Sequence, residues 1–81
     1  MKLVNTIKRI NAINKAMERM PHTEKYYDIH DRLWDKRAAL REELNGWRKE
    51  SKGELRKARI HQIELVCRLL DVSKHHIMSG L

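Results

Sequence analysis

Three side-chain types that commonly carry binding energy in protein interfaces, Trp, Tyr and Arg, are concentrated between residues 27 and 48. Tyr27, Trp34 and Ala38 fall on one stripe of a predicted helix, which gives that helix an apolar anchor. Arginines near this stripe could contact an acidic partner. We therefore predict a partner-binding surface made by Tyr27, Trp34, Arg37, Arg41 and Arg48.

A second candidate site is the basic stretch from Arg48 to Arg59, which carries six bases and two acids. Such a cluster attracts nucleic-acid phosphates or an acidic protein surface, with an affinity that falls as salt rises. A solvated helix face is the simpler interpretation, and Trp47 beside the cluster is assigned to the core. For the alternative function, DNA or RNA binding, the predicted contacts are Lys49, Lys52, Arg56, Lys57, Arg59, Lys74 and His75.

The C-terminal stretch IELVCRLLDVSKHHIMSGL, residues 63–81, resembles the local pattern of a helix-turn-helix. The small Cys67, a turn at residues 70–73 and the following Ile77 carry this resemblance. It implies a recognition helix that presents Lys74, His75 and Met78 to the major groove. The sequence departs from the pattern at Asp71, where Gly is usual, and in the shortness of the last helix. The other interpretation is one long helix, frayed or kinked at residues 71–73.

Signatures of catalysis and metal binding are lacking. The sequence has no glycine-rich phosphate loop, no G-x-S-x-G, no H-E-x-x-H and no Cys/His nucleophile pattern. A small ribonuclease that uses His30 or His61 is disfavoured, because a short helical bundle offers little cleft. We therefore predict a non-catalytic protein with no cofactor, no metal and no small-molecule substrate. Four histidines are nevertheless expected near one acidic pole, without metal-ligand spacing: His22, His30, His75 and His76.

Helices must position these residues. The chain has 81 residues, 41% of them apolar and 36% charged, with a formal charge of +7, three Gly, one Pro and no Phe. This composition disfavours a β-sandwich or barrel. Apolar periodicity predicts helices at about 3–20, 24–45 and 52–78 in a single domain, 1–81. Pro21 ends the first helix, Asn45-Gly46 ends the second, and a Ser51…Glu54 capping box starts the third.

The predicted fold is all-α: a three-helix up-down-up bundle, or an extended helical hairpin plus a third helix. In the up-down-up arrangement the start of the first helix, the end of the second and the start of the third form one basic pole. The third helix carries apolar residues on two sides. One side is assigned to the core: Leu55, Ile63, Val66, Cys67, Leu70, Ile77 and Met78. The other side predicts a homodimer interface: Ala58, Leu65, Leu69 and Val72.

The cellular setting follows from Cys67, the only cysteine, which permits no internal disulfide and favours a reducing compartment. No apolar run approaches the ~20 residues of a membrane span, and membrane-surface binding by the first helix is disfavoured by its three asparagines. We therefore expect a cytoplasmic protein with no membrane contact. It would dock on an acidic protein surface or on nucleic acid and modulate it, as a phage- or plasmid-type accessory or inhibitor protein does.

Overall fold

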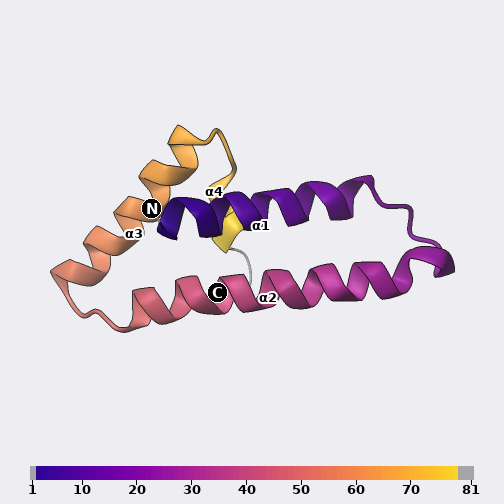
Figure 1. The fold of residues 1–81 in the computed structure, drawn as a ribbon. Coiled ribbons are helices and arrows are strands. Elements are labelled where there is room, and N and C mark those ends of the chain that lie inside the picture. The colour runs from indigo at the N-terminus through magenta and orange to yellow at the C-terminus, as the bar shows by residue number, and fades with distance from the viewer. Residues whose placement is uncertain (1, 79–81) are drawn as a thin grey trace.

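The computed structural model describes residues 2–78 and is all-α over that range, as predicted (Figure 1). Four α-helices and one 3₁₀ turn make up the described chain, and these residues contain no strand. The elements in chain order are α1 (Lys2–Arg19), η1 (Glu24–Tyr26), α2 (Tyr27–Lys49), α3 (Glu54–Leu69) and α4 (Lys74–Met78).

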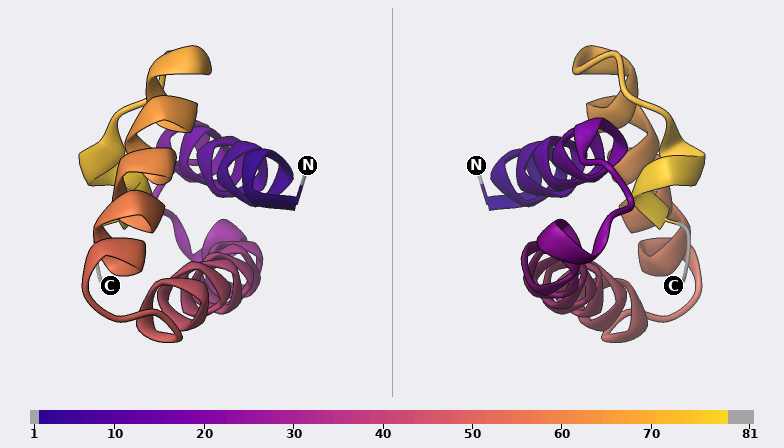
Figure 2. Two further views of the ribbon diagram at one scale, coloured as in Figure 1. Left: turned by 90° about the vertical axis from the view of Figure 1, so that its left-hand side faces the viewer. Right: turned by 90° about the vertical axis from the view of Figure 1, so that its right-hand side faces the viewer.

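Helices α1 and α2 form a long antiparallel hairpin, and the described part of the chain measures 47 × 23 × 20 Å. Viewed along the hairpin, α3 and α4 lie on one side of it and leave the other side open (Figure 2). Helix α3 runs across one end of the hairpin rather than alongside it, so the structure departs from an up-down-up bundle. The start of α1, the end of α2 and the start of α3 do share one end.

The core lies where α3 and α4 cover the hairpin. Its buried side chains come from all four helices: Ile7, Ile10, Leu44, Ile63, Val66, Cys67 and Ile77. Trp47 packs against this cluster, as predicted. Leu55, assigned to the core from its spacing, is instead 55% exposed, because the first turn of α3 lies beyond the hairpin's reach. Burial raises the pKa of the Cys67 thiol, so this side chain serves as a small apolar core residue.

Helix α2 continues through Asn45-Gly46 to Lys49, so the predicted stop at residue 45 is wrong. Leu44 is buried and Trp47 packs on the core, and this packing outweighs the turn preference of the Asn-Gly pair. The predicted capping box is also wrong. The buried Ser51 donates a hydrogen bond from Oγ to the carbonyl of Arg48 at 2.9 Å, which helps to end α2. Gly53, at φ +61°, precedes α3 instead.

The single helix predicted over residues 52–78 is broken at Asp71, which adopts a left-handed backbone with φ +53°. The Asp71 amide donates to the carbonyl of Arg68 at 3.1 Å, and the Val72 amide donates to the carbonyl of Cys67 at 2.9 Å. This pair of hydrogen bonds is the Schellman motif that ends many helices, with Asp in the position usually held by Gly. The chain therefore turns back toward the hairpin as α4.

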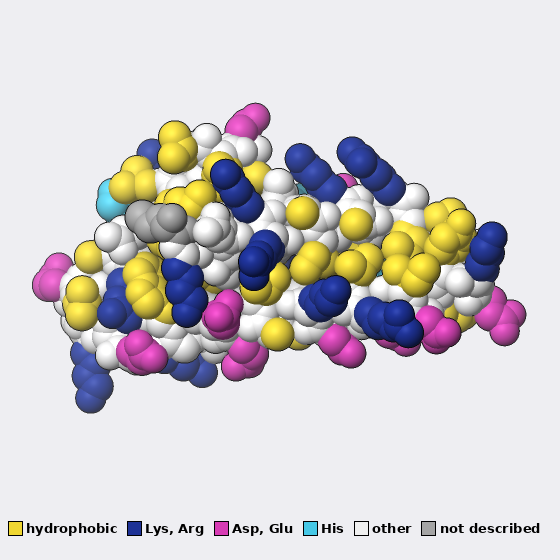
Figure 3. Space-filling model, in the orientation of Figure 1, with side chains coloured by type: hydrophobic (Ala, Val, Ile, Leu, Met, Phe, Trp, Pro, Cys, Tyr) yellow, Lys and Arg dark blue, Asp and Glu magenta, His cyan; other side chains and the backbone are white. Residues whose placement is uncertain are grey.

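Apolar side chains also remain on the surface (Figure 3). Hydrophobic side chains form a band along the junction of α1 and α2 on the open side of the hairpin. A second set lies on the outer face of α3, where Ala58, Leu65 and Leu69 are exposed. Val72, predicted to share this face, instead follows α3 and packs half-buried against the core. Within residues 2–78, no helix combines the length and the apolar character needed to cross a membrane.

Two isoleucines test where the core lies. We expect Ile63→Ala, at a fully buried position, to lower the free energy of unfolding by about 2–5 kcal/mol through lost burial and a residual cavity. Ile29→Ala makes the same chemical change at a 46% exposed position and should cost less than about 1 kcal/mol. Urea denaturation measures both values. Equal losses for the two variants would show that the core lies elsewhere.

Candidate partner-binding groove

One stripe of α2 changes from buried to exposed along its length. Residues 30, 34, 37, 41 and 44 recur at spacings of four and three, so they lie on the same helix face. Leu44 is buried in the core, whereas Trp34, about three turns earlier, is 55% exposed. Helices α3 and α4 cover the stripe only as far as Arg41. The uncovered part forms a groove beside α4.

This groove, called the Trp34 groove below, has a volume of about 510 Å³ and is bounded by α1, α2 and α4. Its walls combine one exposed aromatic side chain with an unusual concentration of basic and titratable groups. The lining residues are Asn14, Met17, Glu18, His22, His30, Trp34, Arg37, Arg41, His75 and His76.

A polar network fixes both arginines of the groove. The guanidinium of Arg37 lies over the Trp34 ring, 4.5 Å from its centroid, and its Nη1 donates to Asn14 Oδ1 at 2.7 Å. Asn14 Nδ2 in turn donates to the His76 carbonyl at 3.3 Å, and Arg41 Nη2 donates to the same carbonyl at 2.7 Å. Because the carbonyls in the last turn of a helix have no partner within it, these bonds attach α4 to the hairpin.

The charge of the groove is positive. Two arginines face one acid, Glu18, so the lining residues carry a formal charge of +1 with the histidines counted as neutral. Desolvation and the neighbouring Arg37 charge lower the pKa of Arg41. An arginine stays protonated in proteins in spite of such a shift. The groove therefore presents two permanent cations beside an apolar ring.

The structure brings together three of the five predicted partner-binding residues: Trp34, Arg37 and Arg41. Tyr27 is 55% exposed on α2, two turns before Trp34, but it does not line the groove. Arg48 does not belong to this surface. Its half-buried side chain donates to Asn45 Oδ1 at 3.0 Å on the same helix, two turns beyond Arg41.

The predicted nucleic-acid contacts are not assembled into one surface. Arg59 stacks on Trp47, donates to its carbonyl and lies 4.0 Å from Glu50, so it is engaged within the chain. Lys57 pairs with Glu54 at 3.4 Å, and Lys74 pairs with Glu64 at 2.6 Å. Lys49, Lys52, Arg56 and Lys57 are all exposed near the end of the hairpin, and the pair that Lys57 makes with Glu54 is itself exposed.

The structure contains the turn that the helix-turn-helix resemblance implies at residues 70–73. It does not contain the recognition surface that the resemblance implies for the last helix. Helix α4 has five residues. Met78, expected at a major groove, instead packs against the core, and His75 faces the Trp34 groove. The same helix that should read bases is thus occupied in closing the fold.

The four histidines expected to gather do line one groove, although they come from the α1–α2 connection, α2 and α4. The rings of His22 and His30 lie 5.3 Å apart. Within residues 2–78, no group of three or more His, Cys, Asp or Glu side chains is arranged to hold a metal ion. Sequence analysis missed Asn14, which joins Arg37 to α4. The sequence does indicate a role for Asn14, because a polar residue on the inner face of α1, one turn from Ile10, needs a hydrogen-bond partner.

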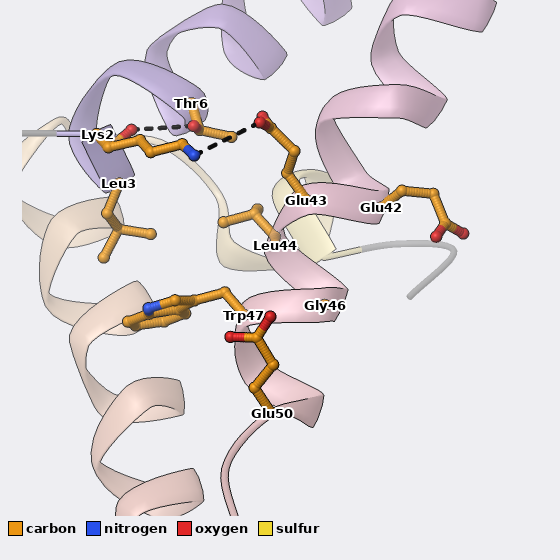
Figure 4. Close-up of a pocket in the computed structure, with 9 residues that line it drawn as sticks. All are labelled: Lys2, Leu3, Thr6, Glu42, Glu43, Leu44, Gly46, Trp47 and Glu50. Carbon is orange, nitrogen blue, oxygen red and sulfur yellow. Dashed lines mark hydrogen bonds and ion pairs between the residues drawn. The ribbon is translucent and has the colours of Figure 1, made fainter.

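A smaller hollow of about 350 Å³ lies between the start of α1 and the end of α2 (Figure 4). Lys2 and Glu43 approach to 3.9 Å across it, and Trp47 and Leu44 form its apolar wall. The acids Glu42, Glu43 and Glu50 also surround it. Its internal ion pair and its mixed charge make it a less distinctive binding site than the Trp34 groove.

No protein-family model matches the chain, and no curated protein or solved structure is similar enough to count as a match. The Trp34 groove is therefore interpreted from its own geometry and charge.

Asn14 and Asn5 provide a matched test of the polar network, since both lie on α1 and only Asn14 joins the network. Asn→Ala raises helix propensity at both positions. We expect Asn14→Ala to be about 1–2 kcal/mol less stable than Asn5→Ala, because Arg37 and the His76 carbonyl each lose a hydrogen bond. Urea denaturation gives the difference, and a difference near zero would contradict the network.

Proposed function

We propose that the protein is a non-catalytic binding module that docks on an acidic segment of a partner protein through the Trp34 groove and thereby modulates that partner. The observation that carries this proposal is the exposed Trp34 ring, held under Arg37 in a groove with a second arginine and four histidines. Trp and Arg dominate the energetics of protein interfaces.

The arginines are preorganised for such a partner. Arg37 is held by Asn14 and by stacking on Trp34, so little side-chain entropy remains to be lost on binding. An arginine has five N–H donors, and the hydrogen bonds described above use one on each side chain. Several donors therefore remain for carboxylate oxygens, which match the planar geometry of the guanidinium.

Nucleic-acid binding is the second candidate, and the exposed Lys49, Lys52 and Arg56 near the end of the hairpin favour it. These side chains could contact phosphates without regard to base sequence. This surface lacks an exposed aromatic ring for base stacking, because Trp47 packs on the core under Arg59. We rank it below the groove for that reason.

We also propose that the protein acts as a homodimer through the outer face of α3. Leu55, Leu65 and Leu69 are 55%, 46% and 79% exposed in the single chain. Apolar surface concentrated on one face of a helix is typical of a protein interface. The spacing of these residues fits contact with another helix.

Trp34→Ala tests the docking site, with Ile29→Ala as a control on the same helix away from the groove. The probe is a synthetic peptide of glutamates interrupted by leucines, followed by NMR of the two tryptophan indole N–H groups. We expect the Trp34 signal to shift and the Trp47 signal to stay. Trp34→Ala should weaken binding at least about tenfold, as an interface anchor does.

Two control ligands decide between the candidate functions. The same peptide with Gln in place of Glu should bind weakly, because it lacks the carboxylates. A single-stranded DNA oligonucleotide that binds more tightly than the acidic peptide and shifts the amides of Lys49, Lys52 and Arg56 would favour the nucleic-acid function instead. Equal binding of the Glu and Gln peptides would also contradict the proposal.

A further inference from the structure

We propose that α3 pairs with α3 of a second copy in antiparallel orientation, about a twofold axis near Gln62, with Glu54 of each copy beside Arg68 of the other. This inference rests on the proposed homodimer and adds its orientation and its ion pairs. It assigns a role to charged side chains that neither the core nor the Trp34 groove uses.

The apolar seam is the first observation. Residues 55, 58, 62, 65 and 69 recur at spacings of three, four, three and four, which is the pattern of a helix that packs along another helix. All five are exposed in the single chain. Ala58 and Gln62 lie in the middle of the seam, flanked by larger leucines toward both ends. The small Ala58 allows the two helices to approach closely at the centre.

The charges along one edge of this seam decide the orientation. Glu54, His61 and Arg68 follow one another at intervals of seven, so they lie in line beside the leucines. Glu54 and Arg68 are about 21 Å apart along the helix at about 1.5 Å per residue. A parallel pair would bring Glu54 to the opposite edge of the other copy, where Arg59 is engaged within its own chain, and would leave Arg68 without an acidic partner. An antiparallel pair instead forms two Glu54–Arg68 contacts related by the twofold axis, because the charges at the two ends are opposite.

The other edge of the seam adds no repulsion. Arg59 begins that edge, but its guanidinium stacks on Trp47, donates to the Trp47 carbonyl and lies near Glu50 within its own chain. The side chain of Arg59 is only 21% exposed. Val66, one further heptad along the edge, is buried in the core. The interface is therefore lined by Leu55, Ala58, Leu65 and Leu69, with Gln62 at its centre, and is charged along one edge only.

A competing contact for Glu54 exists within the chain, since Lys57 approaches it at 3.4 Å. Both side chains of that pair are more than three-quarters exposed, so the pair contributes little. Helix α3 has 16 residues, and a single helix pair of that length falls below the roughly 800 Å² per partner of a standard interface. We therefore expect a reversible dimer whose population depends on protein concentration.

Charge reversal tests the orientation by sedimentation equilibrium of the full chain at low salt. Glu54→Arg and Arg68→Glu should each weaken the dimer about threefold to tenfold, and the double variant Glu54→Arg/Arg68→Glu should restore it. Arg56→Glu makes the same charge change as Arg68→Glu away from this edge and should leave the dimer unchanged. Circular dichroism confirms that each variant is folded.

The possible results distinguish a failure of the antiparallel orientation from a failure of the dimer proposal itself. A wild-type chain that stays monomeric up to about 1 mM, a concentration that detects even weak association, overturns both. If the Leu65→Glu variant still forms the dimer, the outer face of α3 is not the dimer interface. A dimer that needs Leu65 but responds to neither reversal, or that the double variant fails to restore, overturns the antiparallel pairing alone. Acidic-peptide binding by Arg68→Glu should match wild type, which keeps this test independent of the groove.

Discussion

The left-handed backbone at Asp71 is the constraint on which the rest of the structure depends. It stops α3 after Leu69 and turns the chain toward the hairpin, so that Ile77 can enter the core. The same reversal delivers the His76 carbonyl to Asn14 and Arg41. A helix that continued straight through residue 71 would carry residues 74–78 away from α1 and α2. The Trp34 groove would then lose the wall that His75 and His76 provide.

The hairpin of α1 and α2 is long, and α3 and α4 cover only part of it. This mismatch in length explains why both candidate binding surfaces stay exposed. Helices α1 and α2 have 18 and 23 residues, whereas α3 runs across one end of the hairpin and α4 has only five residues. The stripe of α2 that is buried at Leu44 is therefore open at Trp34. Helix α3 in turn keeps an outer face that the hairpin cannot reach. The groove and the outer face of α3 thus have one geometric origin, and they are the two surfaces on which the proposed docking and the proposed self-pairing depend.

Sequence patterns predicted the helical class, a first helix at about residues 3–20 that the structure has at Lys2–Arg19, and the grouping of Trp34 with Arg37 and Arg41, because these depend on spacing within one helix. They failed where tertiary packing overrides local preference. Burial of Leu44 carries α2 through Gly46, and Ser51 ends α2 instead of starting α3. Asn14 was missed because its partners lie on other helices. The structure places Arg48 outside the groove, because helix spacing alone does not show which part of α2 is covered by other helices.

The most direct test of the central claim, that the Trp34 groove holds an acidic protein segment, is site-specific photo-crosslinking. A benzophenone amino acid replaces Trp34 in one variant and Ile29 in a control, both are irradiated in native lysate, and crosslinked peptides are identified by mass spectrometry. The account predicts that position 34 crosslinks to a protein segment rich in Asp and Glu and that Ile29 does not. Crosslinks from position 34 that go to nucleic acid, or to segments without acidic residues, would contradict it.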